Sequence, residues 1–197
     1  MVEEQAHLIV IAPSNGAGKS TAAPALLQAT LGVTEFVNAD AIALGLSGFA
    51  PERAAFRAGR IMIERLQQLA NERVNFAFET TLATRSFAPW IANLRQTGYL
   101  FHLFFLWLPS PELAIARVQE RVRLGGHDVP EETIRRRYHA GIRNFFHLYR
   151  PLADSWFFYD NANTEAPHLL AASEGESGVY VANPLIWQLI EEEYRGR

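Results

Sequence analysis

A glycine-rich turn between an apolar run and a helical pattern constrains this chain more than any other feature. Residues 7–12 form a short apolar run typical of a buried strand, and the next nine residues, 13–21, are PSNGAGKST. A helical pattern follows from about Lys19 to Thr30. In this strand–turn–helix context, backbone N–H groups converge and bind phosphate oxygens. We therefore predict a phosphate-binding loop.

Each position of this loop has an expected role. Gly16 and Gly18 permit the backbone angles and the close approach that phosphate needs. Lys19 reaches the β- and γ-phosphates, and the Ser20 hydroxyl can ligate Mg²⁺. The predicted nucleotide-binding residues of the loop are Asn15, Gly16, Ala17, Gly18, Lys19, Ser20 and Thr21. No guanine-binding Asn/Thr-Lys-x-Asp motif occurs, so ATP with Mg²⁺ is the expected cofactor pair. Pro13 stands where the P-loop pattern has its first glycine, which leaves open a weakened nucleotide site.

Composition narrows the class of protein. The chain has 197 residues, of which 49% are hydrophobic, and this suits a single domain over residues 1–197. There is no cysteine and no signal-like start, so we expect a cytoplasmic protein. The longest apolar run, at 103–108, is too short to cross a membrane, and no membrane partner is expected. Lys19 is the only lysine among 18 basic residues, which suggests that a compact ammonium group is needed there.

Apolar runs alternate with helical patterns along the chain, which predicts an α/β fold with a mainly parallel sheet of about five strands. The expected strands are 7–12, 35–38, 75–79, 99–108 and 156–159. The expected helices are about 19–30, 51–73, 86–97, 111–124, 131–149 and 184–194. Hairpin strands at 168–172 and 178–182, with the last helix, form a predicted appendage over about residues 165–197.

Acidic residues follow two of the predicted strands. Asp40 comes after the second strand, and Glu79 ends the third. Because strand carboxyl ends line the ligand crevice of an open parallel sheet, both carboxylates should face the γ-phosphate. We predict that Asp40 is the base for an attacking hydroxyl and that Glu79 orients the substrate or magnesium-bound water. Two structural alternatives stay open: Asp40 as the cap of a helix from Ala41, and Glu79 as an acceptor for turn amides.

Other polar residues near these carboxylates could hold an anionic substrate. Thr81 and Arg85 lie just beyond Glu79, and Arg57 and Arg60 lie on the polar side of the helix at 51–73. Ordinary solvated surface roles stay open for these three arginines. The candidate substrate-binding residues are Asp40, Arg60, Glu79, Thr81 and Arg85.

Arginines concentrate between residues 117 and 150, where eight stand against four acidic residues, although the whole chain has a charge of −3. A cationic segment after the fourth strand suits a helical lid over the triphosphate, at about residues 121–140, with Gly125 and Gly126 as the hinge. We expect Arg123 and Arg136 to stabilise the transferring phosphoryl group and Arg137 to contact the nucleotide. A nucleic-acid patch is the rival interpretation, but it lacks interleaved aromatic residues, so no nucleic-acid partner is expected.

Ordered motifs over about residues 7–160 resemble the zeta-toxin-like P-loop kinases, in the branch of predicted ABC-type ATPases or kinases. The motifs are residues 15–21, 38–40, 58–60, 78–81, 123–130 and 135–138. The resemblance implies a three-layer P-loop fold near the shikimate and nucleoside monophosphate kinases. It also implies phosphorylation of a UDP-N-acetylglucosamine hydroxyl, with the catalytic aspartate at Asp40 and the Glu-x-Thr pair at Glu79 and Thr81. The family's next arginine falls on Ala83, so Arg85 would have to substitute.

These patterns together predict an ATP/Mg²⁺-dependent kinase of a small metabolite, with UDP-N-acetylglucosamine as the first acceptor to try. An antitoxin protein is the further partner that the resemblance implies. Two alternatives stay open: a kinase of another small molecule such as a nucleotide, and a non-enzymatic ATP-dependent switch.

Overall fold

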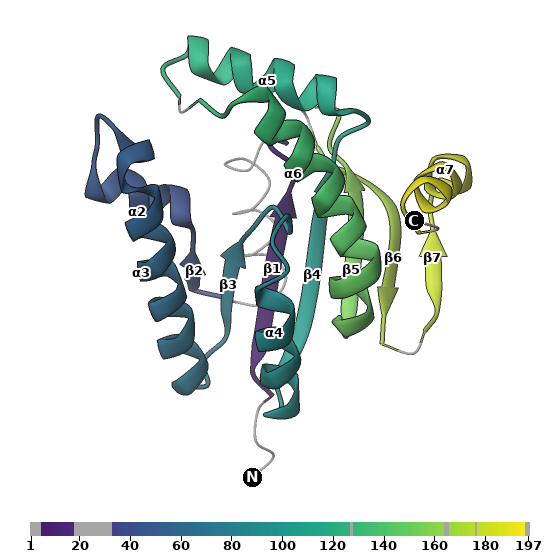
Figure 1. The fold of residues 1–197 in the computed structure, drawn as a ribbon. Coiled ribbons are helices and arrows are strands. Elements are labelled where there is room, and N and C mark those ends of the chain that lie inside the picture. Colours follow the sequence, from purple (N-terminus) through teal and green to yellow (C-terminus); the bar gives the residue numbers. More distant parts are fainter. Residues whose placement is uncertain (1–4, 18–32, 127, 164–165, 176, 196–197) are drawn as a thin grey trace.

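Five strands of a seven-stranded sheet run parallel, so their carboxyl ends lie together at one end of the sheet (Figure 1). The structure is a computed structural model and describes residues 5–17, 33–126, 128–163, 166–175 and 177–195. The strand order is β2-β3-β1-β4-β5-β6-β7. The parallel strands are β1 (His7–Pro13), β2 (Glu35–Val37), β3 (Phe76–Glu79), β4 (Leu100–Trp107) and β5 (Ser155–Asp160). The central position of β1 places the start of the predicted phosphate loop between β3 and β4.

Five α-helices of the described residues lie between β2 and β5, and the bounds of the first four follow local signals. α2 (Ala39–Leu46) follows β2, and α3 (Pro51–Asn71) begins with a proline at its first position. α4 (Phe87–Gln96) leads into β4, and α5 (Pro111–Arg123) starts at Ser110, whose hydroxyl accepts a hydrogen bond from the N–H of Leu113. α5 ends in a Schellman motif, because Gly125 has φ +84° and Gly126 N–H donates to Arg121 C=O at 2.9 Å. The predicted hinge glycines therefore form the stop of this helix.

The long helix predicted at 131–149 is α-helical only to Asn144. α6 spans Glu131–Asn144, a π-helical turn follows at Phe145–Tyr149, and a short 3₁₀ turn follows at Arg150–Leu152. The helical periodicity of the apolar residues gave no sign of this change. The helix predicted at 19–30 lies outside the described residues.

The predicted hairpin is part of the main sheet, so the expectation of about five strands is wrong by two. β6 (His168–Glu174) pairs antiparallel with β5, and β7 (Val179–Val181) pairs antiparallel with β6. The last helix, α7 (Pro184–Arg195), buries Trp187 against Trp156 and Phe146. β6 pairs with the side of β5 that β4 leaves open, where backbone N–H and C=O groups would otherwise be unpaired.

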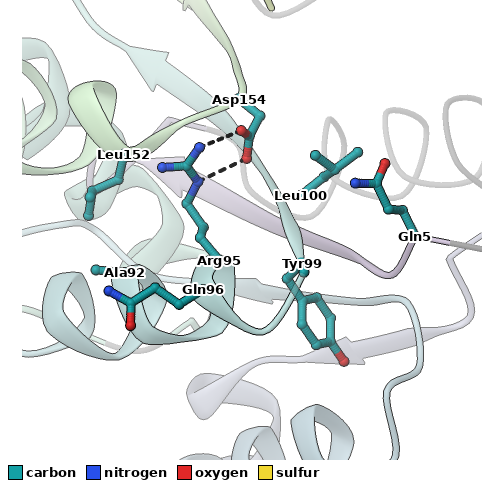
Figure 2. Close-up of a pocket in the computed structure, with 9 residues that line it drawn as sticks. Gln5, Ala92, Arg95, Gln96, Tyr99, Leu100, Leu152 and Asp154 are labelled. Carbon is teal, nitrogen blue, oxygen red and sulfur yellow. Dashed lines mark hydrogen bonds and ion pairs between the residues drawn. The ribbon is translucent and has the colours of Figure 1, made fainter.

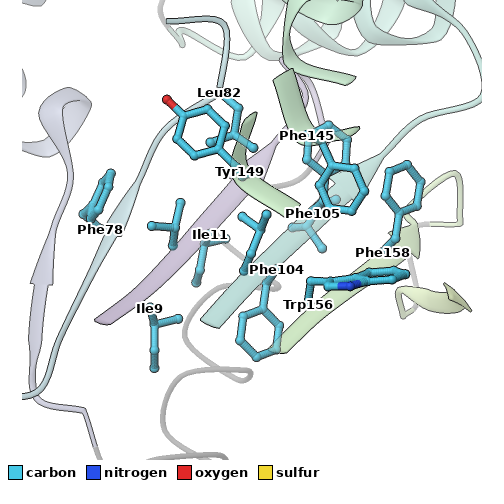
Figure 3. Packing of buried hydrophobic residues seen from close by; sticks show 14 of the residues in the cluster. Ile9, Ile11, Phe78, Leu82, Phe104, Phe105, Phe145, Tyr149, Trp156 and Phe158 are labelled. Carbon is cyan, nitrogen blue, oxygen red and sulfur yellow. The ribbon is translucent and has the colours of Figure 1, made fainter. Parts of the chain in front are cut away.

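An aromatic cluster forms the core between the sheet and the helices on one of its faces (Figure 3). Phe105 of β4 stacks on Phe158 of β5 with ring centroids 5.0 Å apart, and Phe145 lies edge-on to Phe158 at the same distance. Each fully buried side chain of this size contributes about 1.5–3 kcal/mol to folding. No described helix has both the length and the apolar character needed to cross a lipid bilayer.

Candidate functional site

The first half of the predicted phosphate loop is a tight turn at the end of β1. Ser14 N–H donates to Leu106 C=O at 3.0 Å, and Ala17 N–H donates to Ser14 C=O at 2.9 Å. Gly16 has φ +78°, the value that the third residue of a type II turn requires. The turn therefore needs a glycine at this position, as the sequence predicted.

A second reason for glycine lies in α5. A Cβ atom on Gly16 would stand 2.7 Å from Ala114 C=O and 3.1 Å from the Cβ of Arg117. Real Cβ atoms essentially never approach backbone this closely. The start of α5 therefore packs directly against the loop at Gly16 and leaves no space for a side chain there.

Two residues that the sequence analysis missed support this loop from β5 and α5. The side-chain amide of Asn161, just after β5, donates to Ala17 C=O. Arg117 donates to the carbonyls of Asn161 and Ala162 at 2.8 and 2.6 Å. Asn161 follows a strand carboxyl end, so the same rule that selected Asp40 and Glu79 would have found it.

Pro13 is accommodated as the last residue of β1. The pairing of β1 with β3 ends at Ile11 opposite Glu79, and the Thr80 N–H then donates to Ile11 C=O at 3.1 Å. Alternate residues of a strand point their N–H groups to the same neighbour, so the Pro13 nitrogen lies toward β3 beyond the last paired residue. No ladder hydrogen bond is lost at this position. Gly18, Lys19, Ser20 and Thr21 lie outside the described residues.

Asn38 connects the two predicted carboxylates. Its side-chain oxygen accepts from the N–H of Asp40 at 2.7 Å and of Ala41 at 3.2 Å, which makes it the cap of α2. Its amide donates to Glu79 Oε2 at 2.8 Å. The alternative in which Asp40 caps the helix is therefore wrong, because Asp40 is the second residue of α2 and lies exposed in its first turn. Glu79 is buried at the end of β3.

The other predicted substrate-binding residues lie on two separate elements. Thr81 is half-buried and Arg85 exposed in the loop that follows β3, whereas Arg60 is exposed on α3. Ala83, where the resembling family has its arginine, is half-buried in the same loop. The roles of these residues stay predictions.

The predicted lid arginines are carried by α5 and α6, which cross over the carboxyl ends of the parallel strands (Figure 1). Arg123 is exposed at the end of α5 and pairs with Glu120 at 3.1 Å. On α6, Arg136 is exposed and Arg137 is half-buried, while the neighbouring Arg135 pairs with Glu112 of α5 at 2.5 Å. The Arg135–Glu112 pair joins α5 and α6 at the surface.

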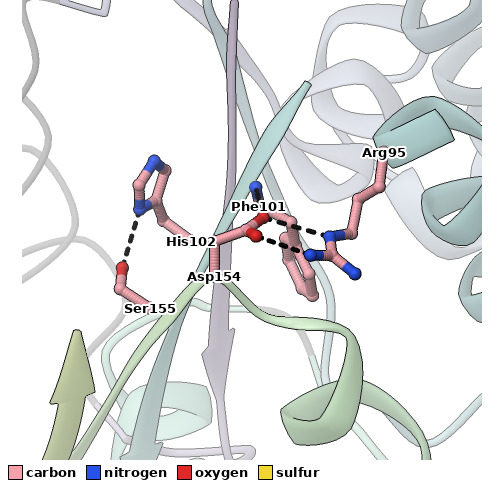
Figure 4. A network of polar contacts seen from close by, with 5 residues as sticks. All are labelled: Arg95, Phe101, His102, Asp154 and Ser155. Carbon is pink, nitrogen blue, oxygen red and sulfur yellow. Dashed lines mark hydrogen bonds and ion pairs between the residues drawn. The ribbon is translucent and has the colours of Figure 1, made fainter. Parts of the chain in front are cut away.

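A pocket lies near the amino ends of β1, β4 and β5, at the other end of the strands from the phosphate loop (Figure 2). It has a volume of about 430 Å³, and Arg95, Tyr99 and Leu152 are among its lining residues. Nearby, Asp154 accepts two hydrogen bonds from Arg95, at 2.5 and 3.1 Å, and one from the Phe101 N–H at 2.8 Å (Figure 4). These contacts lower the pKa of Asp154 although burial opposes them. All of these residues surround the amino ends of β4 and β5, so they brace the fold away from the phosphate loop.

His102 also lies near the amino end of β4. Its Nδ1 lies 2.7 Å from Ser155 Oγ, and its Nε2 lies 2.8 Å from Nδ1 of His7. Burial and, to a smaller extent, the nearby His7 lower the pKa of His102 to about 4, and Asp154 partly opposes this. The imidazole is therefore neutral at physiological pH.

The described part of the loop has the tight glycine turn of a phosphate-binding loop. Asn15 is buried with an Oδ1 that has no hydrogen-bond partner among the residues that the structure describes. A buried acceptor without a partner is costly, and phosphate oxygens are themselves acceptors, so a donor such as magnesium-bound water would stabilise this oxygen.

A sequence-family model described as AAA domain matches residues 8–140. An uncharacterized protein of Haemophilus influenzae (strain ATCC 51907 / DSM 11121 / KW20 / Rd) is 29% identical over 125 residues, which cover 64% of this chain and 87% of that protein. The family match includes the phosphate loop and the strands β1 to β4.

Solved structures share the fold at low identity. A chain from the PezAT chromosomal toxin–antitoxin system of Streptococcus pneumoniae has a TM-score of 0.65 and 17% identity, with coverage of 100% of this chain and 81% of that one. The AvrRxo1-ORF1:-ORF2 structure with ATP has a TM-score of 0.71 and 15% identity, over 95% of this chain and 64% of that one. A gluconokinase of Sinorhizobium meliloti 1021 has a TM-score of 0.52 and 18% identity, over 82% and 86%. These likenesses show an α/β P-loop kinase fold.

Proposed function

The chain belongs to the AAA domain family, and from that premise we propose that it is an ATP/Mg²⁺-dependent kinase that phosphorylates a hydroxyl of a small metabolite. The observation that carries this proposal is that a phosphate-loop turn and a pair of acidic residues lie together at the carboxyl ends of adjacent strands. The Gly16 turn ends β1, and the Asn38–Glu79 hydrogen bond joins the ends of β2 and β3 beside it. A phosphate loop beside two carboxylates suits transfer to a hydroxyl.

The nucleotide would be held by the loop at residues 15–21. ATP supplies the transferable γ-phosphoryl group when bound, and Mg²⁺ neutralises charge on the phosphates. Backbone N–H groups of the turn would bind phosphate oxygens, Lys19 would hold the β- and γ-phosphates, and Ser20 would ligate the metal ion. Because Lys19 is the only lysine, ATP should protect a single internal amine from labelling.

Asp40 is our proposed base. Its carboxylate would accept the proton of the acceptor hydroxyl while Glu79, held by Asn38, orients the acceptor. The first turn of α2 stabilises negative charge at Asp40, because the helix N-terminus is electropositive. Thr81, Arg85 and Arg60 would bind anionic groups of the acceptor.

The lid would close over the phosphates with Arg123, Arg136 and Arg137. Arg123 and Glu120 have side-chain exposures of 76% and 60%, and ion pairs that open to solvent contribute about 0–1 kcal/mol. Arg123 can therefore exchange Glu120 for a phosphate at little cost. The lid at about 121–140 and the C-terminal part at about 165–197 would belong to a single kinase domain over 1–197.

UDP-N-acetylglucosamine is the acceptor that we propose to try first. The zeta-toxin-like motifs support this choice, and so does the likeness in fold to a chain of the PezAT toxin–antitoxin system. An antitoxin protein is the proposed partner on the same grounds. We place the reaction in the cytoplasm, where an ATP-dependent kinase finds its substrate.

The test is mass spectrometry of a metabolite panel that includes UDP-sugars and nucleoside monophosphates, incubated with the protein and ATP·Mg²⁺. The proposal predicts one product that is heavier by a phosphoryl group and that disappears in Lys19→Ala. Phosphorylation of a nucleoside monophosphate would replace the proposed acceptor, and no phosphorylated metabolite in the panel would contradict the kinase proposal.

A further inference from the structure

The loop after β3, residues 80–86, holds a conformation that its own sequence does not favour; we name it the acceptor loop. Leu82 has φ +54° and is fully buried. A branched, non-glycine residue in the left-handed region costs about 1–3 kcal/mol and persists only where its surroundings enforce it. The local hydrogen bond from Leu82 N–H to Thr80 Oγ1 is long, at 3.4 Å, so the enforcing contacts come from elsewhere.

Three residues of α6 and the π-helical turn contact this loop. The side-chain amide of Asn144, which is buried, donates to Leu82 C=O at 2.7 Å. The hydroxyl of Tyr149, also buried, donates to Thr84 C=O at 2.7 Å. Gly141 packs directly on Thr81, since a Cβ atom there would stand 2.5 Å from Thr81 C=O. The carbonyl groups of Thr81, Leu82 and Thr84 are thus all contacted from the same helical segment.

The π-helical turn explains how one helix reaches all three positions. Residues five apart in an α-helix differ by about 140° around the axis, at 3.6 residues per turn, so Asn144 and Tyr149 would then point to different sides. The π-helical hydrogen-bond pattern joins residues five apart and aligns them. The turn at Phe145–Tyr149 therefore brings Tyr149 to the side of Asn144.

Burial keeps both donors in the form that the contacts need. It raises the pKa of Tyr149 to about 12, although the backbone N–H groups of Phe87 and Ala88 lower it, so the phenol remains a donor at neutral pH. The Asn144 amide does not titrate. The loop is therefore held by neutral hydrogen bonds that neither salt nor moderate pH changes should weaken.

We propose that Gly141, Asn144 and Tyr149 are positioning residues that hold the acceptor loop in the conformation in which Glu79 and Thr81 meet the acceptor. This inference rests on the proposed kinase function for its kinetic consequence. The three residues act through the loop and contact neither nucleotide nor acceptor. These residues lie at the end of α6, the predicted lid helix, and in the turn that follows it. They therefore connect the helix that would bind the nucleotide to the loop that would bind the acceptor.

Two conservative variants test this inference. Asn144→Leu keeps the size of the side chain and removes the donor to Leu82, and Tyr149→Phe removes only the hydroxyl. Ile142→Val is the matched control, because Ile142 is buried on the same helix and no hydrogen bond joins its side chain to the loop. Hydrogen exchange of peptides covering 80–86 needs no substrate. We expect it to be about tenfold faster in both test variants and unchanged in the control, as the loss of a buried hydrogen bond implies.

The kinetic readout uses ATP·Mg²⁺ and UDP-N-acetylglucosamine. We expect the KM for this acceptor to rise about tenfold in both test variants, while the Kd for ATP stays within about twofold. Loop exchange as slow as in Ile142→Val would overturn the inference, and so would equal changes in KM and in the Kd for ATP. If the wild-type protein does not phosphorylate this acceptor, the proposed substrate fails, and the hydrogen exchange alone decides whether the three residues hold the loop.

Discussion

The side-chain amide of Asn38 donates to Glu79 Oε2 at 2.8 Å, while the oxygen of the same side chain caps the helix that carries Asp40. One residue therefore sets the relative positions of both proposed acceptor-side carboxylates. The carboxyl ends of β2 and β3 are adjacent in the sheet, which makes this short connection between them available.

Asn38→Ala should destabilise the protein more than the loss of a helix cap alone. A lost cap costs about 0.5–2 kcal/mol, and the buried Glu79 also loses a donor. Ser110→Ala is the matched control, because Ser110 caps α5 through Leu113 and has no carboxylate partner in the described hydrogen bonds. Urea denaturation of both variants measures the difference, and equal losses would mean that the Asn38–Glu79 contact contributes nothing.

Gly16→Ala should lose both stability and nucleotide binding. The substitution forces a side chain into φ +78° and against Ala114 C=O, and overpacking of this kind adds about 1–3 kcal/mol to the backbone cost. Gly125→Ala shares the positive φ but would meet nothing within 4 Å, so it measures the backbone cost alone. Thermal unfolding and ATP titration compare the two variants. Similar losses of stability in both variants would contradict the proposed clash of the Gly16→Ala side chain with α5.

Pro13→Gly should leave the affinity for ATP unchanged. Pro13 loses no ladder hydrogen bond at the end of β1, so glycine gains nothing there in the folded state. The substitution should nevertheless lower the free energy of unfolding by about 0.4–1 kcal/mol, because glycine frees the unfolded chain. Calorimetric titration with ATP·Mg²⁺ checks the first point. Clearly tighter binding in the glycine variant would show that the proline weakens the nucleotide site.

His102 should make the protein acid-sensitive between about pH 6.5 and pH 4. The unfolded imidazole binds a proton near pH 6.5, whereas the native one does so only near its lowered pKa of about 4. The unfolded state binds more protons in this window, so the free energy of unfolding falls as pH falls and is fully present above pH 6.5. His102→Gln should flatten this dependence in urea denaturation at pH 7 and pH 5. An unchanged slope would assign the acid sensitivity to other groups.

The sequence predicted the parts of the fold that depend on local patterns. The apolar runs marked β1 to β5, and the Ser110–Pro111 pair marked the start of α5. The joining of β6 to β5 is a long-range pairing, and the π-helical turn keeps the apolar spacing of a helix, so neither left a local signal. Asn38 was missed as a connecting residue because Glu79, which it binds, is distant in sequence, whereas Asn161 could have been found from its place after a strand carboxyl end.

Asp40→Asn in a single-turnover assay with γ-labelled ATP tests the central claim most directly. The substitution keeps the size of the side chain and the Asn38 cap on α2, because that cap binds the backbone N–H of residue 40. We predict an unchanged Kd for ATP·Mg²⁺ and a loss of about 10²- to 10⁴-fold in phosphoryl transfer to the acceptor, the usual contribution of a general base. Transfer at the wild-type rate would contradict Asp40 as the base, and with it the proposed mechanism.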